Sequence, residues 1–410
     1  MTDQQLRLTV TEIVRSTRVT DMHTHLFPPS FGSLQMSGAD HVLTYHYLIA
    51  EAFRVHTHAY DAFFDLDTKR QAEVIWDSLF VRNSPLSEAA CGVLTIAKTL
   101  GADLGDLDSL RQTLQAQAGD EYVERVMDAA GVERLVMTND PLDEREAVHW
   151  RGGVKVHPRF HAALRLDRVL NDFAGAVRQL TALGYAVCAD LSGQTFDEVR
   201  RFLEDWAQVM HPVYLALSVE PTFDFPDDSV RSQLLREAVL PFCAAQRLPL
   251  ALMIGVRRQV NPQLRDAGDS SGLASLVPIE RLCAMYPEQR FLVTVLAREN
   301  QHALAVTARK FRNLMPFGCW WFVNTGSLVD EITRMRLELL GPTFIPQHSD
   351  ARVLEHLIYK WHNSRTVIAG VLADQYEALA STGLRVTDDQ IQRDVTRLLD
   401  NNFWDFVQRG

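Results

Sequence analysis

Two histidines one residue apart, His23 and His25, are the first residues of the chain whose types and spacing suggest chemistry. They lie near the end of VTDMHTHLF, residues 19–27, a run rich in β-branched and apolar residues that is typical of a strand. Because side chains alternate along a strand, both imidazoles face the same way and can chelate one divalent metal. Asp350, near the other end of the chain, offers a carboxylate to complete the site.

A second pair with the same spacing, His56 and His58, provides a comparison within the same chain. It lies in a stretch whose apolar residues recur at three and four positions, as in a helix, where side chains two residues apart point in different directions. We therefore expect exposed or helix-terminal histidines there. His348, two residues before Asp350, is expected to pack beside the site rather than to bind the metal.

Eight strand-like runs are the elements that must position these side chains. They lie at residues 19–27, 134–140, 159–166, 212–219, 249–256, 290–297, 316–323 and 343–349, and amphipathic stretches separate most of them. Strands that alternate with helices form a parallel sheet, so eight of them predict an α/β fold, a (β/α)8 TIM barrel. Pro346 in the last run is a counter-signal, since proline cannot donate to a strand ladder. A doubly wound open sheet is the alternative fold.

The alternation stops between the first two strands, where the apolar pattern is entirely helical. This predicts a catalytic barrel made of residues 1–30 and 131–410, with a helical insertion over residues 31–130 that contributes to the active site. Active sites of such barrels lie at the carboxyl ends of the strands. Since the first and last strands are neighbours in a closed barrel, we expect His23, His25 and Asp350 to meet there.

Composition excludes several classes of function. The chain has 410 residues, of which 47% are hydrophobic, as in a globular protein. With 41 Lys and Arg against 52 Asp and Glu, the net charge of −11 disfavours nucleic acid and anionic membranes as partners. Five widely spaced cysteines indicate a reducing compartment, and neither a secretion signal nor a membrane span is recognisable. We expect a cytoplasmic protein.

Further motifs follow one another along most of the chain. They are LTYHYLIAE at 43–51, RFHAALRLD at 159–167, LAREN at 296–300, FGCWWF at 317–322 and QHSDAR at 347–352. The opening VTDMHTHLF resembles the amidohydrolase superfamily, and the whole set is similar to the uronate (glucuronate) isomerases. The resemblance extends from about residue 18 to the NNFWDFV segment at the carboxyl end.

This resemblance implies an aldose–ketose isomerase that interconverts D-glucuronate with D-fructuronate, and D-galacturonate with D-tagaturonate, through a metal-stabilised cis-enediol. One divalent metal, zinc foremost and otherwise manganese, cobalt or iron, would be bound by His23, His25 and Asp350. Asp350 and Tyr47 are both candidates for moving the proton from C2 to C1. His46 would bind a substrate hydroxyl and assist ring opening.

Arginines on the rim would bind the substrate, because a uronate is an anion and the acidic chain cannot attract it from a distance. Arg165, Arg298 and Arg352 follow the third, sixth and eighth predicted strands, where a guanidinium can hold a carboxylate with two hydrogen bonds. The resemblance assigns Arg165 to the substrate carboxylate and Arg352 to a place near the reacting hydroxyls. It also places Trp361 in the substrate pocket.

Other residues near the predicted site are given structural roles. Trp320 and Trp321 are expected to pack in the barrel wall, and His161, His302 and His356 to serve the structure. The loop over residues 266–275, next to the fifth strand, is a candidate lid.

Two other functions remain open. The predicted fourth strand has no lysine and the fifth and sixth have no histidine, so the two-metal site of hydrolases in the superfamily is hard to assemble. A mononuclear metal-dependent hydrolase or decarboxylase on the same scaffold is the first alternative, and a non-catalytic sugar-acid-binding protein is the second. The expected partner is a small-molecule uronate, and the expected assembly is a homo-oligomer.

Overall fold

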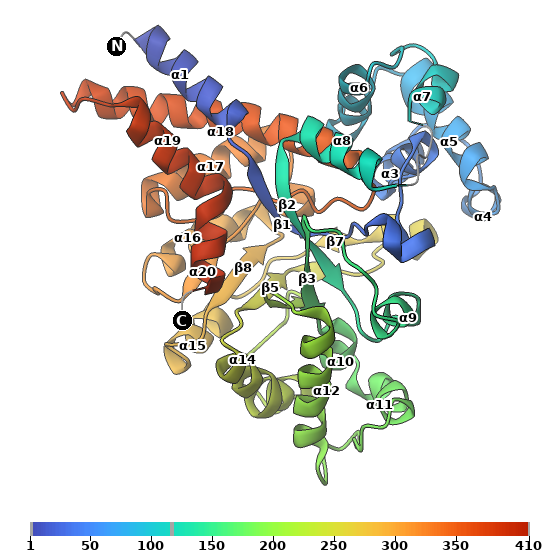
Figure 1. Ribbon diagram of the computed structural model, residues 1–410. Coiled ribbons are helices and arrows are strands. Elements are labelled where there is room, and N and C mark those ends of the chain that lie inside the picture. The colour runs from blue at the N-terminus through green and yellow to red at the C-terminus, as the bar shows by residue number, and fades with distance from the viewer. Residues whose placement is uncertain (1–2, 115–118, 409–410) are drawn as a thin grey trace.

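Seven parallel strands form the centre of the computed structural model, which describes residues 3–114 and 119–408 (Figure 1). They are β1 Val19–Thr24, β2 Val132–Asn139, β3 Phe160–Arg165, β4 Leu215–Val219, β5 Leu250–Ile254, β8 Phe291–Val295 and β9 Leu314–Pro316. Each strand pairs in parallel with the next one in this order. The predicted α/β barrel type is therefore confirmed, and the doubly wound alternative is wrong because no strand in the order is out of sequence.

The expected eighth strand, residues 343–349, is wrong as a regular strand. This stretch meets the β9 edge at one bridge, in which Phe317 pairs with Ile345. Ile345 N donates to the carbonyl of Pro316 at 3.1 Å. Pro346 comes next in the chain and has no N–H with which to continue the ladder.

Residues 345–351, which we call the closing segment, also bind the β1 edge. The backbone N–H of Asp350 donates to the carbonyl of His23 at 3.2 Å, and that of His25 donates to the carbonyl of Ala351 at 2.8 Å. Asp350 has a φ of 53°, in the left-handed region that residues with a side chain rarely adopt. The closing segment thus links the two edges of the sheet by an irregular path and brings Asp350 to the end of β1.

The seventh strand is also shorter than the expected run over residues 316–323. β9 ends at Pro316, and the backbone then leaves the extended region at Gly318, with a φ of 64°, and at Trp321, with a φ of 48°. Residues Trp321–Val323 form a 3₁₀ turn, η6. The apolar composition of this run is typical of a strand, and the sequence pattern does not indicate the two left-handed residues. The predicted strand is therefore too long.

Helices fill the connection between β1 and β2, and in Figure 1 most of them gather at the upper right, beside the sheet. They are η1 Pro29–Leu34, α2 Ala39–Leu43, α3 His46–Ala52, α4 Tyr60–Phe64, α5 Thr68–Trp76, η2 Asp77–Val81, α6 Glu88–Leu100, α7 Leu107–Thr113 and α8 Asp120–Ala130. Residues 1–2 and 409–410 of the expected barrel, and residues 115–118 within the expected insertion, lie outside the described residues.

The remaining helices and a short two-stranded sheet follow the barrel strands. They are α9 Glu144–Arg151, α10 Asp167–Asn171, α11 Phe173–Ala182, α12 Thr195–Met210, α13 Val230–Leu234, η3 Leu235–Val239, α14 Leu240–Gln246, β6 Val256–Arg257, η4 Pro262–Gly268, β7 Ser270–Ser271, α15 Val277–Met285, η5 Arg298–Asn300, α16 Gln301–Ala308, α17 Gly326–Leu340, α18 His356–Ser381, α19 Asp388–Thr396, η7 Arg397–Asn401 and α20 Asn402–Gln408, with α1 Asp3–Ser16 before β1. Across the described ranges, no helix combines the length and the apolar character that crossing a membrane requires.

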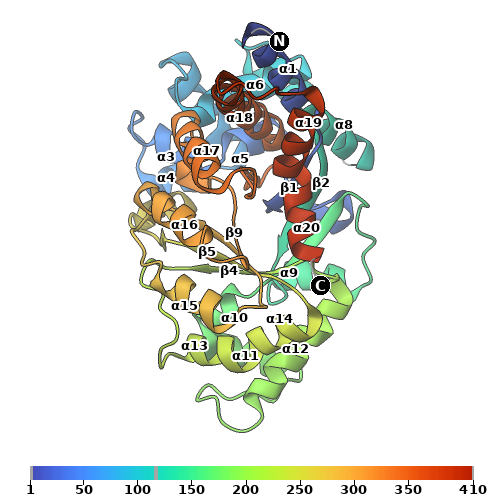
Figure 2. The ribbon, with the colours of Figure 1, turned by 90° about the vertical axis from the view of Figure 1, so that its left-hand side faces the viewer.

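Helix α18 connects the barrel with the helices that precede β2. It packs against α1, α17, α6 and α8, and both Figure 1 and Figure 2 show it lying next to α1. Residues 352–355 connect its first turn to the closing segment. The position of Asp350 is therefore fixed between a strand edge and a long, well-packed helix.

Gly318 provides a test of how tightly the closing segment is packed. A Cβ on Gly318 would overlap the ring of His348, which lies in the closing segment, whereas a Cβ on Gly101, at the end of α6, would meet nothing within 4 Å. Both glycines have positive φ angles, 64° and 86°, so both substitutions by Ala carry a backbone cost. We predict that Gly318→Ala lowers the free energy of unfolding by about 1–3 kcal/mol more than Gly101→Ala, because of overpacking. Chemical denaturation measures both, and equal losses would show that the closing segment yields easily.

Candidate metal centre

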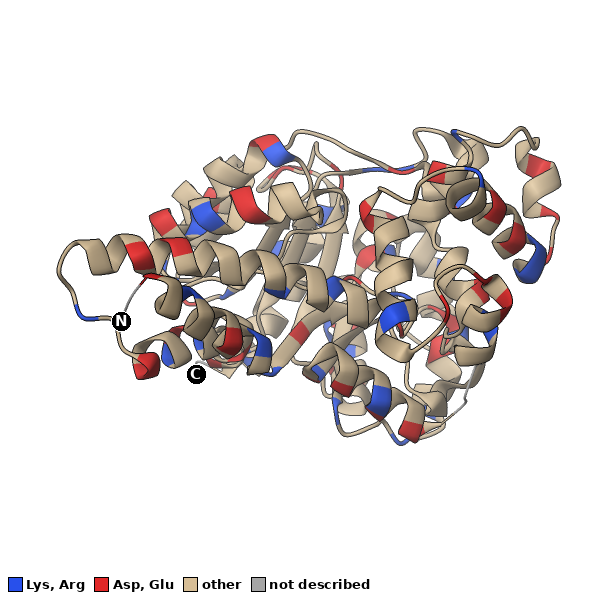
Figure 3. Cartoon of the chain, turned by 90° about the horizontal axis from the view of Figure 1, so that it is seen from above, with Lys and Arg blue, Asp and Glu red and all other residues tan. Residues whose placement is uncertain are grey.

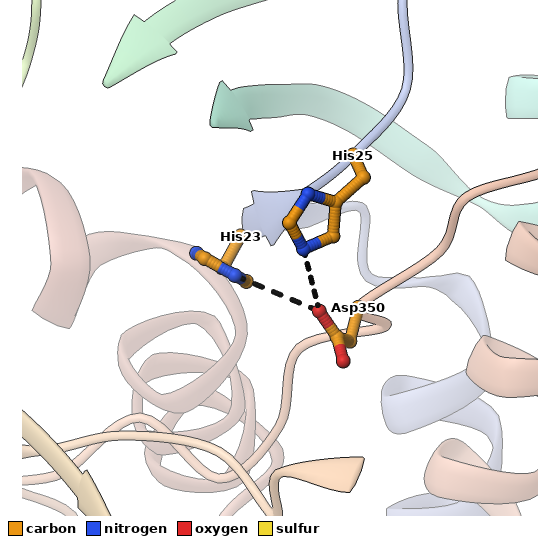
Figure 4. Close-up of side chains that lie close together, drawn as sticks. All are labelled: His23, His25 and Asp350. Carbon is orange, nitrogen blue, oxygen red and sulfur yellow. Dashed lines mark ion pairs between the residues drawn. The ribbon is translucent and has the colours of Figure 1, made fainter. Parts of the chain in front are cut away.

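The three expected ligands do come together at the carboxyl end of β1 (Figure 4). Asp350 Oδ1 lies 3.6 Å from His23 Nε2 and 3.3 Å from His25 Nε2. One donor atom from each residue lies within 4.8 Å of the other two. Asp350 Oδ1 is buried and accepts no hydrogen bond from any described residue. A buried carboxylate oxygen without a donor, facing two imidazole nitrogens, fits a divalent cation.

The protonation states of these residues also suit a metal. Burial lowers the pKa of His23 well below its ordinary value and lowers that of His25, so both imidazoles are neutral near pH 7. Burial opposes the charge of Asp350, but the facing imidazoles of His25 and His23 outweigh it and lower the pKa of the carboxyl. Two neutral imidazoles and one carboxylate are the forms that bind metal.

Asp21 is a residue of the site that the sequence analysis missed. It is completely buried on β1, two residues before His23, where the pairing of β1 with β2 is irregular between Asp21 and Thr24. Its Oδ1 accepts a hydrogen bond from the backbone N–H of Ser349 at 3.0 Å, and its Oδ2 accepts one from Trp361 Nε1 at 2.8 Å. Burial raises its pKa to about 6. Asp21 thus ties the closing segment and α18 to β1, and its spacing from His23 was a signal that could have found it.

Two hollows adjoin the ligands and share Arg352. The inner cavity, of about 30 Å³, is lined by His23, His25, Thr138, Arg165, Asp167, Ala216, Ser218, Met253, Arg258, Trp320, Trp321, Asp350 and Arg352. The outer cavity, of about 390 Å³, is lined by Met36, His41, Thr44, Tyr45, His46, Ile49, Phe64, Gln71, Leu264, Arg265, Asp266, Ala267, Arg352 and Val353. The inner cavity has room for a metal ion or a water, and the outer one has room for a small organic molecule.

Two of the three expected arginines lie on these walls. Arg165 lines the inner cavity and binds Asp167 through two hydrogen bonds of 2.7 and 3.1 Å. Burial opposes the charge of Arg165, but the ion pair with Asp167 outweighs it and raises the pKa of the guanidinium. Arg352 lines both cavities and lies 3.9 Å from Asp266, on the expected lid loop.

The third expected arginine, Arg298, lines neither cavity. Its side chain is 57% exposed and pairs with Glu331 on α17 at 2.9 Å. Its place after the sixth predicted strand was the reason for the prediction, but there the chain turns into η5 and directs the residue to the surface. Arg258, which the sequence analysis did not consider, lines the inner cavity instead and pairs with Asp269 at 2.6 Å.

The tryptophans near the site differ from the expectation in which of them line a cavity. Trp361, expected in the substrate pocket, is 1% exposed and lines neither cavity, because its indole N–H is used by Asp21. Trp320 and Trp321, expected to pack in the wall, are buried as predicted but also line the inner cavity. After β9 ends at Pro316, the left-handed residues Gly318 and Trp321 turn the chain so that this tandem pair lies at the site.

His46 and Tyr47, both at the start of α3, have different surroundings. His46 lines the outer cavity, and its buried Nε2 has no hydrogen-bond partner among the described residues. Tyr47 is on the wall of neither cavity; its ring packs against those of Tyr45 and His46, with Lys360 Nζ 5.2 Å from its centroid. Burial raises the pKa of Tyr47 well above its ordinary value. A phenolate at this position is therefore disfavoured near neutral pH.

The other histidines are separate from the ligand set. His348 is fully buried with its ring centroid 5.4 Å from that of His23, and neither of its ring nitrogens has a partner among the described residues. In the second pair, the backbone N–H of His58 donates to His56 Nδ1 at 3.0 Å, within the loop between α3 and α4. Within residues 3–114 and 119–408, one group of His, Cys, Asp and Glu side chains has the spacing of a metal site, and it is His23, His25 and Asp350.

Comparison with family models and with curated proteins gives no match for this chain. Three solved structures are similar over nearly the whole length. A uronate isomerase from Thermotoga maritima has 14% identity and a TM-score of 0.75, with 98% of this chain and 97% of that chain covered. A glucuronate isomerase from Caulobacter crescentus has 16% identity and a TM-score of 0.78, with 99% and 94% covered. At these identities, both show the fold alone.

The third similar structure is much nearer in sequence. It is a uronate isomerase from Bacillus halodurans C-125, with 47% identity and a TM-score of 0.98, and the match covers 100% of this chain and 98% of that chain. Identity at this level over the full length, together with the ligands and arginines gathered at the carboxyl end of the barrel, shows that this chain belongs to the uronate isomerase family.

Proposed function

We propose that the enzyme is an aldose–ketose isomerase that interconverts D-glucuronate with D-fructuronate and D-galacturonate with D-tagaturonate. The observation that carries this proposal is the meeting of His23, His25 and Asp350 beside a cavity that also holds Arg165 and Arg352. A divalent cation held by the three ligands, with zinc the first candidate, would polarise the oxygens on C1 and C2 of the open-chain sugar. The 47% identity to a uronate isomerase favours this reaction over hydrolysis or decarboxylation.

The arginines hold the anionic end of the substrate. Arg165 has a guanidinium that Asp167 already keeps charged and oriented, and it is the residue we assign to the uronate carboxylate. Arg352 reaches both cavities and is assigned to the hydroxyls near the reacting carbons. His46 lines the outer cavity with an unpartnered Nε2, which suits a hydrogen bond to a sugar hydroxyl during ring opening.

Asp350 is the base that we assign to the proton transfer. The proton leaves C2 for the carboxylate and returns to C1, while the hydrogen of the C2 hydroxyl passes to the aldehyde oxygen on C1, so that the carbonyl moves from C1 to C2 and the net change is an isomerisation. Asp350 lines the inner cavity and is ionised, whereas Tyr47 lines neither cavity and has a raised pKa. These differences support Asp350 over Tyr47.

The proposal includes the wider organisation of the enzyme. Residues 31–130 act as a helical insertion that contributes to the active site, supported by His46 and Tyr45 on the wall of the outer cavity. The enzyme works on small molecules rather than nucleic acid, as a cytoplasmic homo-oligomer. The absence of a disulfide among its five cysteines agrees with a reducing compartment.

The reaction itself can be followed by NMR in deuterated water. We predict that the zinc-loaded enzyme converts D-glucuronate or D-galacturonate to the ketose, that a chelator stops the conversion, and that added zinc restores it. The position of any deuterium, at C1 or C2, reports exchange of the transferred proton with solvent. A folded, metal-loaded enzyme that converts neither uronate would refute the proposed function.

The identity of the base is tested by comparing two substitutions. We predict that Asp350→Asn lowers kcat by at least about 100-fold, the usual scale for loss of a general base. Tyr47→Phe should cost less, because the phenol lies off the cavity wall. Circular dichroism and metal analysis check that both variants are folded and loaded. If Tyr47→Phe is the more damaged of the two, Tyr47 and not Asp350 moves the proton.

The carboxylate role of Arg165 is tested against Arg298. We predict that Arg165→Met lowers kcat/KM for uronates by about 10- to 100-fold, the worth of a charged hydrogen bond, with an unchanged metal content. Arg298→Met removes the same charge at a surface ion pair and should leave kcat/KM within about twofold of the wild type. A loss of metal in Arg165→Met, or equal kinetic effects in both variants, would contradict the assignment.

A further inference from the structure

Two hydroxyl groups contact the ring nitrogen of His23 that does not face Asp350. Its Nδ1 lies 3.2 Å from Thr138 Oγ1 and 3.4 Å from Tyr214 Oη. Thr138 is near the end of β2, and Tyr214 directly precedes β4, so two different strands converge on one nitrogen. The three residues are between 0% and 5% exposed. The opposite nitrogen, Nε2, faces Asp350.

The hydroxyl of Tyr214 has a defined direction. It donates its hydrogen to the backbone carbonyl of Met22 at 2.7 Å, so toward His23 it presents oxygen lone pairs and acts as an acceptor. The contact of Tyr214 with Nδ1 is therefore a hydrogen bond only when Nδ1 carries the hydrogen. Thr138 is compatible with this, because a hydroxyl can accept as well as donate.

This network decides which nitrogen of His23 can bind a cation. A neutral imidazole has a single N–H, so a hydrogen on Nδ1 leaves the lone pair on Nε2, the atom that faces Asp350. The carbonyl that orients Tyr214 belongs to Met22, the residue immediately before His23 on β1. Strand β1 therefore carries the ligand His23 and, through the carbonyl of Met22, also orients the Tyr214 hydroxyl that contacts Nδ1 of His23.

His25 lacks such support. Its side chain is 22% exposed and lines the inner cavity. Among the described residues, its polar side-chain contact is with Asp350, at 3.3 Å. The two imidazoles of the site are therefore not equivalent, since His23 is locked into the barrel while His25 faces the cavity.

We infer that Tyr214 and Thr138 are positioning residues that hold His23 as its Nδ1–H tautomer, with the Nε2 lone pair aimed at the metal position before any metal binds. The inference deepens the proposed function and rests on it for the presence of a metal. Partners of this kind, which accept the free N–H of a ligating histidine, typically contribute 10- to 100-fold to metal affinity or activity.

The tautomer can be observed without metal. In metal-free protein labelled with ¹⁵N-histidine, the signal lost in His23→Gln identifies His23, and its one- and two-bond couplings show which nitrogen carries the hydrogen. We expect the Nδ1–H form in the wild type and a mixture, or the Nε2–H form, in the double variant Tyr214→Phe, Thr138→Val. A wild-type protein with His23 in the Nε2–H form would overturn the inference, whatever its activity.

Zinc affinity, measured by competition with a chromophoric chelator, provides the second readout. We expect a loss of about 10- to 100-fold in the double variant and no change in Tyr185→Phe. Tyr185→Phe is the matched control because it removes a tyrosine hydroxyl that bonds Asp205 on α12, away from His23. Unchanged affinity in a folded double variant would overturn the inference.

If Tyr214→Phe does not fold, the single variant Thr138→Val and the tautomer of His23 in the wild-type protein test the inference instead. The outcome is also separable from that of the proposed function. A wild-type enzyme with the Nδ1–H tautomer and tight zinc binding, but without isomerase activity, would contradict the proposed function and leave this inference standing.

Discussion

Two backbone hydrogen bonds, from Asp350 to the carbonyl of His23 and from His25 to the carbonyl of Ala351, determine the geometry of the site. They join residues that are more than three hundred positions apart in the chain, and they do so at the point where the sheet has no regular eighth strand. Asp350 can face both imidazoles because its backbone leaves the strand conformation there, with a φ of 53°. Strain at such a position persists only when the surrounding structure over-determines it.

That surrounding structure consists of side chains that bind the closing segment from several elements. Asp21 accepts hydrogen bonds from Ser349 and from Trp361, which links β1, the closing segment and α18. On the other side, the ring of His348 fills the space above Gly318. The carboxylate is thus positioned by buried, well-packed residues rather than by a mobile loop, as a preformed ligand set requires.

Positive charge is concentrated at the site, although the chain as a whole is acidic. In the view of Figure 3, acidic and basic residues are interspersed along the helices, and the chain has a net charge of −11. The inner cavity nevertheless gathers Arg165, Arg258 and Arg352. Each lies within 4 Å of an aspartate, at 2.7, 2.6 and 3.9 Å for Asp167, Asp269 and Asp266 respectively. These ion pairs hold the guanidinium groups in place on the cavity wall.

The sequence predicted most of the fold and the centre of the site, for a physical reason. Alternation along β1 places His23 and His25 on one face, and the order of strands places the last segment beside the first. What failed depended on backbone detail that side-chain patterns do not carry. The closing segment and the end of β9 looked like strands, but Pro346 and the left-handed residues Trp321 and Asp350 interrupt them.

Two of the expected substrate-binding residues line neither cavity, for the same kind of reason. Arg298 follows a strand end, as Arg165 does, but η5 carries it to the surface. Trp361 is close to the site in space, yet its N–H is taken by Asp21, a residue the sequence analysis passed over. Strand position indicates which residues are near the site. The direction of each side chain is decided by the loop that follows and by its hydrogen-bond partner.

The central claim is that His23, His25 and Asp350 share one cation, and anomalous diffraction from crystals of the zinc-loaded enzyme tests it most directly. Our account predicts a single strong peak at the zinc edge, about 2.0–2.2 Å from His23 Nε2, His25 Nε2 and a carboxylate oxygen of Asp350. Zinc bound elsewhere with these three side chains unligated, or a site that omits Asp350, would contradict it.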